Sequence, residues 1–355
     1  MKILFVNSSL TDGGSERAMS LVAGQMAGFG YDVEMLLLRD KKKTYSIDPR
    51  IEVVQLSYSS TSKSVILIER LRKIRSTVKE SKADCVITFM WDLNVMVLAA
   101  TIGLKTQKVI SERAYPGSSH RTKVSRILER AFYRFADVIV YQTEDARSFC
   151  PQALLEKSRV IPNIVMKPVI EPYSGIRDKR IVSVGRLTEQ KNFPLLIKAF
   201  SMFAKTNPDY ILEIYGEGSL KTALRSLSRD LGISKSVVFK GYVCNIAEEI
   251  RNACMFVLPS NYEGISNAIT EAMAMGIPTI CTDCPAGGAA MMIESGVNGL
   301  LVPVGDDVKL ARAMIRVADD DVLARNFSRN AKEVATRFSA DKIGRMWEEV
   351  IDVAR

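Results

Sequence analysis

Short runs of β-branched and other apolar residues recur along the whole chain, and most are separated by stretches with helical spacing. The first run is KILFVN at residues 2–7, and the pattern after it places apolar side chains at Met19, Leu21, Val22 and Met26. Strands without a polar face are buried on both sides, and helices between such strands are the crossovers of parallel sheets. The alternation therefore predicts an α/β protein with doubly wound, Rossmann-like parallel sheets.

The strand candidates fall into two groups with a linker between them. The first group continues with VEMLLL, IEVVQL, CVITFM, KVISE and VIVYQT, and the second contains RIVSVGRL, YILEIYG, VVFKGYV, MFVLPS and PTICTD. Residues 159–180 carry three prolines and a glycine and separate the groups. A chain of 355 residues is also longer than one hydrophobic core usually grows. We therefore predict two domains, residues 1–172 and 173–338, and a final helix at about 339–355 that packs back on the first.

Composition and hydropathy favour a cytoplasmic globular protein. Hydrophobic residues make up 47% of the chain and charged residues 25%, and no apolar run approaches the length of a membrane-spanning helix. The amino-terminal MKILFVNSSL has a short apolar run and no small-residue cleavage site, which favours a buried strand over a signal peptide. Cys281 and Cys284 form a lone C-x-x-C without a nearby histidine, so we predict no metal site and buried thiols throughout.

The net charge of +9 is unevenly distributed. Residues 1–172 contain 26 Lys and Arg against 18 Asp and Glu, whereas the remainder contains 23 against 22. Two segments of the basic half, 64–80 and 118–137, combine apolar residues at helical spacing with basic ones, and Arg126, Arg130 and Arg134 form an i, i+4 stripe. We expect most of the apolar area to pack on a sheet, while the charges attract an anionic membrane or a lipid diphosphate. Nucleic acid is not expected, because no binding motif accompanies the charge.

Glycines and cations follow several strand candidates, where doubly wound sheets bind ligands. Gly13 and Gly14 in TDGGSER can let a backbone approach a ligand, or they can simply make a tight turn. In GRLTEQKN, Arg186 and Lys191 suit a diphosphate, although a solvated basic loop is the alternative. Gly216 in IYGEGS and Gly241 in FKGYV can accept a flat base against exposed backbone, but each signal is unspecific on its own.

Two glutamates stand eight residues apart in NYEGISNAITEAMAMGIP. We predict that Glu263 lies in a loop and Glu271 in a helix from about Ser266 to Met275, with the free N–H groups near Ser266, Asn267 and Ala268 between them. Free N–H groups at a helix start bind phosphate. A carboxylate, a phosphate site and a second carboxylate fit an extended ligand with hydroxyls at both ends, such as a nucleotide-sugar. The alternative is that Glu263 only caps the helix, where the helix dipole favours an acid, and that Glu271 is a core residue whose hydrogen bonds are satisfied.

Taken together, these motifs make the chain resemble the retaining glycosyltransferases of family 4, which have the GT-B fold of two Rossmann-like domains facing across a cleft. The resemblance rests on GRLTEQKN, YGEGSLKTAL, VVFKGYV, PSNYEGISNAITEAMAMGIPTICTD and GVNGLLVP, and on VNSSLTDGGSERAMSLVAGQM near the amino terminus. DGGSER with ISER is similar to bacterial transferases that build surface polysaccharides or lipid-linked oligosaccharides from UDP-sugars. The resemblance implies an acceptor-binding first domain and a nucleotide-sugar-binding second domain.

The resemblance also implies a role for each motif. Glu263 would hold hydroxyls of the transferred sugar, a hexose or N-acetylhexosamine, and Glu271 those of the ribose. Arg186 and Lys191 would bind the diphosphate, so that no metal or other cofactor is needed. In addition, Gly13 and Gly14 would close on the donor from the opposite domain, and the segment Gly241–Val243 would face the uracil. The implied acceptor is a lipid-linked glycan at the inner face of the cytoplasmic membrane.

Two positions depart from the family pattern. Arg113 stands where many members carry a histidine near the sugar, and the chain's single histidine, His120, is seven residues further on, where we expect it at the surface. In CPAGGAAMMIESG, two alanines occupy a place where relatives often have a charged residue. Two other functions remain open from the residues: a GT-B-like UDP-GlcNAc epimerase, which the scarcity of histidine argues against, and a non-catalytic nucleotide-sugar-binding protein.

Overall fold

The computed structural model describes residues 1–11, 14–39, 47–59, 62–117, 122–166, 173 and 175–352. The chain divides into two compact units, which we call the N-terminal unit (Met1–Ile164 with Ala340–Arg355) and the C-terminal unit (Val165–Ser339). The division thus falls at Ile164, whereas the sequence placed it at residue 172; residues 167–172 lie outside the described part of the chain.

The N-terminal unit contains a seven-stranded parallel sheet in the order β3-β2-β1-β4-β5-β6-β7. Its strands are β1 (Lys2–Asn7), β2 (Asp32–Leu37), β3 (Glu52–Gln55), β4 (Cys85–Phe89), β5 (Gln107–Glu112), β6 (Val138–Tyr141) and β7 (Ser158–Val160). Its helices are α1 (Gly14–Gly28), α2 (Lys63–Glu80), α3 (Trp91–Thr101), α4 (Lys123–Phe132), α5 (Glu144–Arg147) and α14 (Ala340–Asp352), with 3-10 turns η1 (Tyr133–Phe135) and η2 (Gln152–Lys157).

The C-terminal unit contains a six-stranded parallel sheet in the order β10-β9-β8-β11-β12-β13. Its strands are β8 (Asp178–Val184), β9 (Ile211–Tyr215), β10 (Val237–Gly241), β11 (Ala253–Leu258), β12 (Thr279–Asp283) and β13 (Leu300–Pro303). Its helices are α6 (Phe193–Phe203), α7 (Lys221–Asp230), α8 (Ile246–Ile250), α9 (Asn267–Ala274), α10 (Gly288–Met292), α11 (Asp307–Asp319), α12 (Asp321–Ala331) and α13 (Glu333–Arg337).

Both sheets are doubly wound, which confirms the predicted fold class. The chain adds strands on one side of β1 or β8 and then crosses to the other side, so the strand order reverses between β1 and β4 and between β8 and β11. Ligands of open α/β sheets bind in the crevice outside the carboxyl ends of the strands at such a reversal. The sequence did not predict β7 and β13, because each is a short strand at a sheet edge, and β7 falls at the start of the proline-rich linker.

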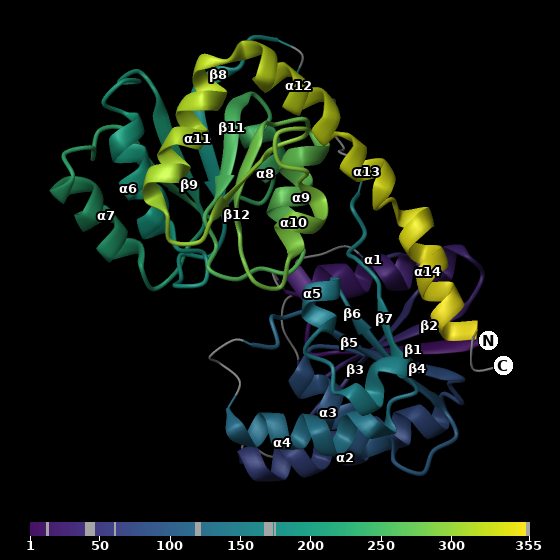
Figure 1. The fold of residues 1–355 in the computed structure, drawn as a ribbon. Coiled ribbons are helices and arrows are strands. Elements are labelled where there is room, and N and C mark those ends of the chain that lie inside the picture. The colour runs from purple at the N-terminus through teal and green to yellow at the C-terminus, as the bar shows by residue number, and fades with distance from the viewer. Residues whose placement is uncertain are drawn as a thin grey trace. The chain divides into compact units, whose positions relative to one another are not determined.

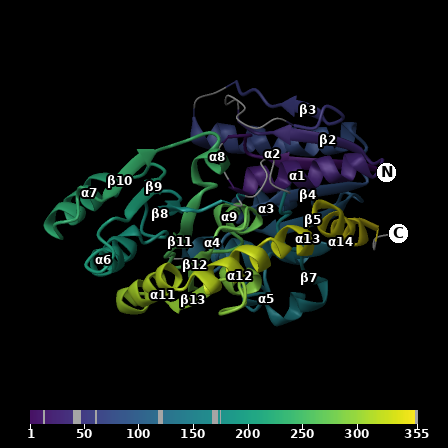
Figure 2. The same ribbon diagram turned by 90° about the horizontal axis from the view of Figure 1, so that it is seen from above.

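Helices cover both faces of the N-terminal sheet. Helices α2, α3 and α4 form one layer (Figures 1 and 2), in which α3 contacts both of its neighbours. Side chains of α2 and α3, such as Ile74 and Val97, join a core cluster with strand residues such as Val86. On the opposite face, α14 packs against α1, and its Trp347 stacks on Phe89 with 5.5 Å between ring centroids.

Glycine allows α14 to lie close to α1. A side chain at Gly344 would place its Cβ 2.4 Å from Cγ of Gln25 and 3.1 Å from the ring of Phe29, so the helices meet where α14 has no side chain. The Nε2 atom of Gln107 in β5 also donates to the carbonyl of Val350 at 3.1 Å. The carboxyl-terminal helix is therefore part of the N-terminal unit although the second sheet intervenes in sequence.

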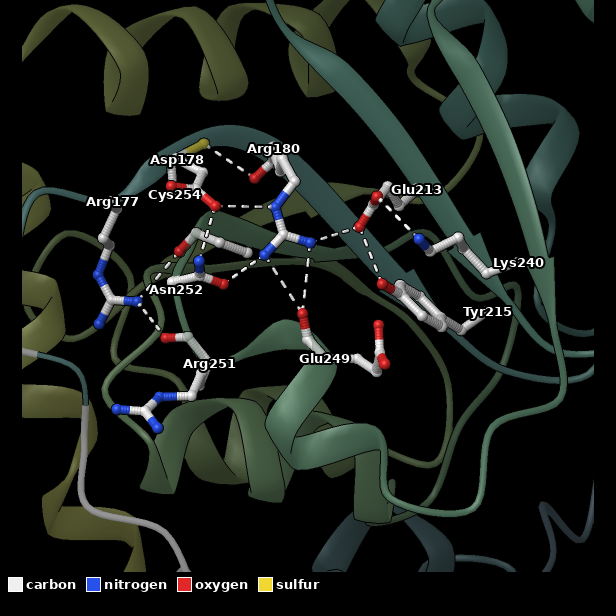
Figure 3. Close-up of polar contacts among 11 residues, drawn as sticks. Arg177, Asp178, Arg180, Glu213, Tyr215, Lys240, Glu249, Arg251, Asn252 and Cys254 are labelled. Carbon is white, nitrogen blue, oxygen red and sulfur yellow. Dashed lines mark hydrogen bonds and ion pairs between the residues drawn. The ribbon is translucent and has the colours of Figure 1, made fainter.

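A polar network crosses one face of the C-terminal sheet beneath α8 (Figure 3). Arg180 in β8 donates to Glu213 in β9 at 2.6 Å and to the side chain of Asn252. Tyr215 donates to the same carboxylate at 2.8 Å, and Lys240 in β10 lies 3.5 Å from it. Burial raises the pKa of Glu213, but the hydrogen bonds from Tyr215 and Arg180 outweigh burial and hold that pKa below its ordinary value. The network thus joins three adjacent strands through satisfied charges.

Two further sequence predictions concern membrane spans and thiols. Among the described residues, no helix is both long enough and apolar enough to cross a bilayer. All six cysteines are free thiols, and Cys85, Cys150, Cys281 and Cys284 are buried as predicted. The prediction is wrong for Cys244, which is exposed in the loop after β10, and Cys254 at the start of β11 is only partly buried.

Candidate active site

An ion pair marks the point where the strand order of the C-terminal sheet reverses. Lys191 lies in the loop after β8 and Glu263 in the loop after β11, which is the neighbouring strand. Nζ of Lys191 donates to Oε2 of Glu263 at 2.5 Å, and the side chains are only 11% and 13% exposed. Oγ of Ser260 donates to the same oxygen at 3.3 Å. The parallel sheet therefore brings together a cation and a carboxylate that sequence analysis had predicted in separate motifs.

The loops that carry the ion pair are bonded directly to each other. The backbone N–H of Asn261 donates to the carbonyl of Gln190 at 2.8 Å, and its side-chain amide donates to the carbonyl of Glu189 at 2.8 Å. The amide of Asn192 donates to Oδ1 of Asn261 at 2.9 Å, and the amide of Gln190 donates to the carbonyl of Tyr262 at 3.2 Å. These four bonds fix the spacing of Lys191 and Glu263.

Two glycines allow the backbone around the ion pair to pack closely. A Cβ at Gly185 would lie 3.2 Å from the Lys191 side chain, so the lysine stem lies against bare backbone. A Cβ at Gly288 would lie 1.9 Å from the carbonyl oxygen of Gly264, so the start of α10 reaches the Glu263 loop only because residue 288 is glycine. The N–H of Gly288 donates to the carbonyl of Glu263 at 3.2 Å.

Helix α9 begins next to the ion pair, and its predicted bounds are confirmed. Ser266 precedes the helix in an extended conformation with φ −80° and ψ 124°, and its side chain makes no capping hydrogen bond. The helix continues through Asn267 and Ala268 to Ala274, and Gly276 follows with φ +69°. The first N–H groups of any α-helix have no intrahelical acceptor and carry partial positive charge. The structure thus places the start of α9 between Glu263 in its loop and the half-buried Glu271 within the helix, and its predicted binding of an anion stays a prediction.

Arg186 lies at the same strand edge as Lys191 but is exposed to solvent. Burial raises the pKa of Tyr262, the adjacent Glu263 raises it further, and Arg186 lowers it. The guanidinium is therefore close enough to the Glu263 loop to influence charge there. Lys191 is held in place by its ion pair, whereas Arg186 is exposed, and its predicted contact with a diphosphate stays a prediction.

The glycines after β9 and β10 have a packing role that the sequence did not show. Gly216 has φ +130°, and a Cβ there would lie 2.0 Å from the carbonyl oxygen of Gly185. Its N–H donates to the carbonyl of Gly241 at 2.7 Å, and Gly241 itself has φ +75°. Val243 follows in the same loop and is half-buried. The glycines therefore set three neighbouring loops against one another, and their predicted contact with a base stays a prediction.

We expect Gly216→Ala to displace the loop that carries Arg186 and Lys191. The added methyl group would collide with the Gly185 carbonyl, and a backbone conformation adopted almost only by glycine costs another residue about 1–3 kcal/mol. Donor-nucleotide affinity, measured by calorimetry, should fall by at least about ten-fold. Gly232→Ala is the matched control, since Gly232 has φ +73° and nothing within 4 Å of its Cβ position. If both variants bind nucleotide equally well, the close approach at Gly216 does not shape the site.

In the N-terminal unit, the loop after β1 is organised by a glutamate. Glu16 in the first turn of α1 accepts hydrogen bonds from Ser9 Oγ at 2.8 Å and from both the N–H and Oγ1 of Thr11 at 3.1 and 3.0 Å. Gly14 is the exposed first residue of α1. Gly13 and His120 lie outside the described residues, so their predicted positions are not addressed by the structure.

Arg113 follows β5 and packs inside the N-terminal unit. Its guanidinium carbon lies 4.4 Å from the ring centroid of Phe89 and 5.5 Å from that of Trp347, and Nη1 donates to Oδ1 of Asn163 at 2.8 Å. Nε and Nη2 are buried and have no hydrogen-bond partner among the described residues. Burial lowers the pKa of Arg113 to about 9. Arg113 therefore links the carboxyl end of β4 to the terminal helix α14.

Sequence analysis missed the residues that support the site. Asn192, Asn261, Gly185 and Gly288 lie within or beside the motifs, but no local pattern predicted a role for them. The available signal was a polar amide or a glycine directly beside a predicted ligand at a strand end. Among the described residues, no three His, Cys, Asp or Glu side chains gather as a metal site.

Two family models match most of the chain. Residues 13–163 match the family described as "Glycosyl transferase 4-like domain", and residues 172–334 match "Glycosyl transferases group 1". Two relatives come from Campylobacter jejuni. N-acetylgalactosamine-N,N'-diacetylbacillosaminyl-diphospho-undecaprenol 4-alpha-N-acetylgalactosaminyltransferase is 29% identical, with 95% of each chain covered. The transferase that acts on GalNAc-alpha-(1->4)-GalNAc-alpha-(1->3)-diNAcBac-PP-undecaprenol is 27% identical, with 99% of this chain and 98% of the relative covered.

Solved structures agree with the fold. Anabaena HepE, crystallised in complex with UDP-glucose, superposes with a TM-score of 0.83 at 19% sequence identity, with 99% of this chain and 100% of HepE covered. That likeness agrees with a fold that contains two parallel, Rossmann-like sheets. The two family models thus match the two halves of the chain in turn. The chain belongs to the GT-B glycosyltransferases, with a glycosyl transferase 4-like domain followed by a group 1 domain.

Proposed function

We propose that this glycosyltransferase moves a hexose or N-acetylhexosamine from a UDP-sugar to a hydroxyl group of a lipid-linked glycan, with retention of the anomeric configuration. The observation that carries the proposal is the Lys191–Glu263 pair at the β8/β11 reversal, directly beside the start of α9. The two Campylobacter relatives, whose names specify diphospho-undecaprenol-linked acceptors, and HepE with bound UDP-glucose support the choice of acceptor and donor. The product would enter bacterial polysaccharide or glycoconjugate assembly.

The leaving diphosphate would be neutralised by fixed positive charge. Lys191 and Arg186 would approach it from the loop after β8, and the N–H groups of Asn267 and Ala268 would bond it from the start of α9. Groups of this kind stabilise developing negative charge best when they are already in place and partly shielded from water. Lys191 meets both conditions, because its loop is bonded to the Glu263 loop and its side chain is nearly buried. We therefore propose that transfer needs no metal ion.

The two carboxylates would orient the hydroxyl groups at opposite ends of the diphosphate. Glu263 would accept hydrogen bonds from the transferred sugar while its second oxygen stays paired with Lys191. Glu271, further along α9, would accept from the ribose, and the Gly241–Val243 segment would border the uracil. Gly13 and Gly14 would approach the donor from the N-terminal unit.

Retention would follow from attack on the face that the diphosphate leaves. The bond between the sugar C1 and the diphosphate oxygen breaks, the bond from C1 to the acceptor oxygen forms, and the acceptor proton passes to the departing phosphate. Lys191 would stabilise the negative charge that develops on that phosphate, and Glu263 would hold the sugar in place while the two bonds at C1 break and form. No protein carboxylate needs to bond covalently to the sugar in this scheme.

A donor panel tests the proposal. The purified chain is incubated with several UDP-sugars and an undecaprenyl-diphosphate-linked oligosaccharide, with and without a chelator, and the anomeric configuration of the product is read by NMR. The expected result is UDP release with one donor, a retained configuration and no effect of the chelator. Isomerised UDP-sugar in the absence of acceptor would indicate an epimerase instead, and UDP binding without turnover on any acceptor would indicate a binding protein.

A further inference from the structure

Arg113 leaves part of its guanidinium without a partner inside the N-terminal unit. Nη1 donates to Oδ1 of Asn163 at 2.8 Å, whereas Nε and Nη2 are shielded from solvent and bond to none of the described residues. Burial alone lowers the pKa of Arg113 to about 9, and no carboxylate in the described part of the chain raises it again. The acid before it in sequence, Glu112, accepts instead from Tyr133. A buried cation without a counter-charge is costly, so this position calls for an anion.

The two unpaired nitrogens form one edge of the guanidinium, which we call the Arg113 fork. The N–H groups of Nε and Nη2 on this edge point in parallel, and such a pair matches two oxygens of a carboxylate or a phosphate. The rest of the guanidinium is already held. Nη1 bonds to Asn163, and the guanidinium carbon lies 4.4 Å from the ring centroid of Phe89 and 5.5 Å from that of Trp347. The edge that remains is the one suited to bidentate binding.

Two further buried donors lie on the same face of the sheet as the Phe89 ring. Nε1 of Trp347 and Nδ2 of Asn7 have no acceptor among the described residues, and these side chains belong to residues that are 0% and 4% exposed. Trp347 stacks directly on Phe89. Val6 in β1 pairs with Thr88 in β4, and the next residue of each strand turns its side chain to the opposite face. Asn7 is therefore a neighbour of Phe89 on that face.

A group that only accepts hydrogen bonds fits this set of donors better than water does. The side-chain acceptors of the same region are already used, because Oδ1 of Asn7 accepts from the N–H of Ser8 and Oδ1 of Asn163 accepts from Arg113 and Gln142. A water molecule would have to donate as well as accept. It would also leave the buried charge uncompensated. An oxyanion accepts from several donors at once and supplies the missing negative charge.

We propose that the Arg113 fork binds an oxyanion, either a carboxylate or a phosphate, inside the N-terminal unit. The fork would donate to two of its oxygens, and the N–H groups of Trp347 and Asn7 would complete the set of donors. The anion would thereby join the carboxyl ends of β1 and β4 to α14. The inference does not rest on the proposed sugar transfer, because all of these residues belong to the N-terminal unit and none has a role in the proposed diphosphate site.

Thermal unfolding of the full chain tests the proposal. Sodium phosphate, sulfate or acetate replaces sodium chloride at constant ionic strength, and the acetate and phosphate arms distinguish a carboxylate site from a phosphate site. A ligand that binds only the folded chain raises the melting temperature. At about ten times its dissociation constant, the preferred oxyanion should raise the wild-type value by about 3–6 °C.

Arg113→Met should respond with the opposite sign. Methionine removes the uncompensated cation and keeps an unbranched side chain between the two rings, so in chloride the variant should melt at or above the wild-type temperature. Phosphate, sulfate and acetate should then leave its melting temperature unchanged relative to chloride.

The matched control is Arg345→Met in α14. The guanidinium carbon of Arg345 also lies 4.4 Å from a ring centroid, that of Phe29, but its side chain is 59% exposed and pairs with Glu348 at 2.8 Å. This variant removes a stacked arginine from the same helix contact without touching the Arg113 fork. It should therefore keep the whole rise in melting temperature that the oxyanion gives the wild type.

Crystals of the full chain grown with selenate give a direct measurement. Anomalous density is expected within hydrogen-bond distance of Nε and Nη2 of Arg113. The proposal is overturned if no oxyanion raises the wild-type melting temperature above that in chloride, if Arg113→Met shows the same rise, or if selenate binds only elsewhere. Should Arg113→Met fail to fold, Arg113→Lys keeps the charge without the fork, and a rise as large as that of the wild type would equally overturn the proposal.

Discussion

Lys191→Met is expected to lower kcat/KM for the donor by about 10³-fold without unfolding the protein. Methionine keeps an unbranched stem that can lie against Gly185, but it removes the cation that faces Glu263 at 2.5 Å. The loss of one fixed group that stabilises transition-state charge typically costs 10²- to 10³-fold. Here the lysine is nearly buried and also sets the position of Glu263, which argues for the upper part of that range. The measurement is steady-state transfer with the active donor, together with the melting temperature.

A double variant tests whether Lys191 and Glu263 act in catalysis as one pair or independently. Because Lys191 and Glu263 form one pair, Lys191→Met/Glu263→Gln should be no worse than the more impaired single variant. Lys179→Met is the matched control at the other end of β8, where Lys179 pairs with Asp209 and both side chains are more than half exposed. An exposed pair contributes little, so kcat/KM should change less than about two-fold. Wild-type turnover by Lys191→Met would show that the Lys191–Glu263 pair does not contribute to catalysis.

Asn267→Pro is expected to weaken UDP binding between about ten- and 100-fold while leaving the fold intact. Proline lacks the backbone N–H, and hydrogen bonds to charged groups are worth about 1.5–3 kcal/mol. Position 267 is the first residue of α9, where proline is well tolerated. Ser266 before it already has ψ 124°, the extended conformation that a residue preceding proline adopts. The substitution can therefore delete one phosphate donor without disturbing the helix.

The control for this variant is Asn267→Ala, which removes the same side chain and keeps the N–H. Calorimetric titration with UDP should show near-normal affinity for the alanine variant and weak affinity for the proline variant. Denaturant unfolding should place both within about 1 kcal/mol of the wild type. Equal UDP affinity in the two variants would mean that the start of α9 does not bind the diphosphate.

Much of the fold could be predicted because the signals are local. Eleven strand candidates were placed from short apolar runs, and β1, at Lys2–Asn7, has the predicted bounds. Helix α9 was placed from its flanking loop and from Gly276, which ends it in a left-handed conformation. The strands β7 and β13 were missed because an edge strand of three or four residues carries too few side chains to show a pattern.

The site was predicted as separate motifs, and the sheet assembled them. Lys191 and Glu263 are 72 residues apart in sequence, and only the parallel pairing of β8 with β11 brings their loops together. The amides of Asn192 and Asn261 gained a role only when that pairing was known. No local pattern contains such a contact, because it depends on strand order and on which strand ends meet.

The sequence by itself determined that the chain is doubly wound α/β and that 118–137 is an amphipathic basic segment, since both follow from the spacing of apolar residues. Only the tertiary structure decided which side of α4 is covered. Helical periodicity shows that Val124, Ile127 and Leu128 share a side, but it does not show whether a neighbouring layer lies against them. The packing of α4 through Ser125 and Phe132 left that side in solvent, because burial depends on what the rest of the chain places beside a helix.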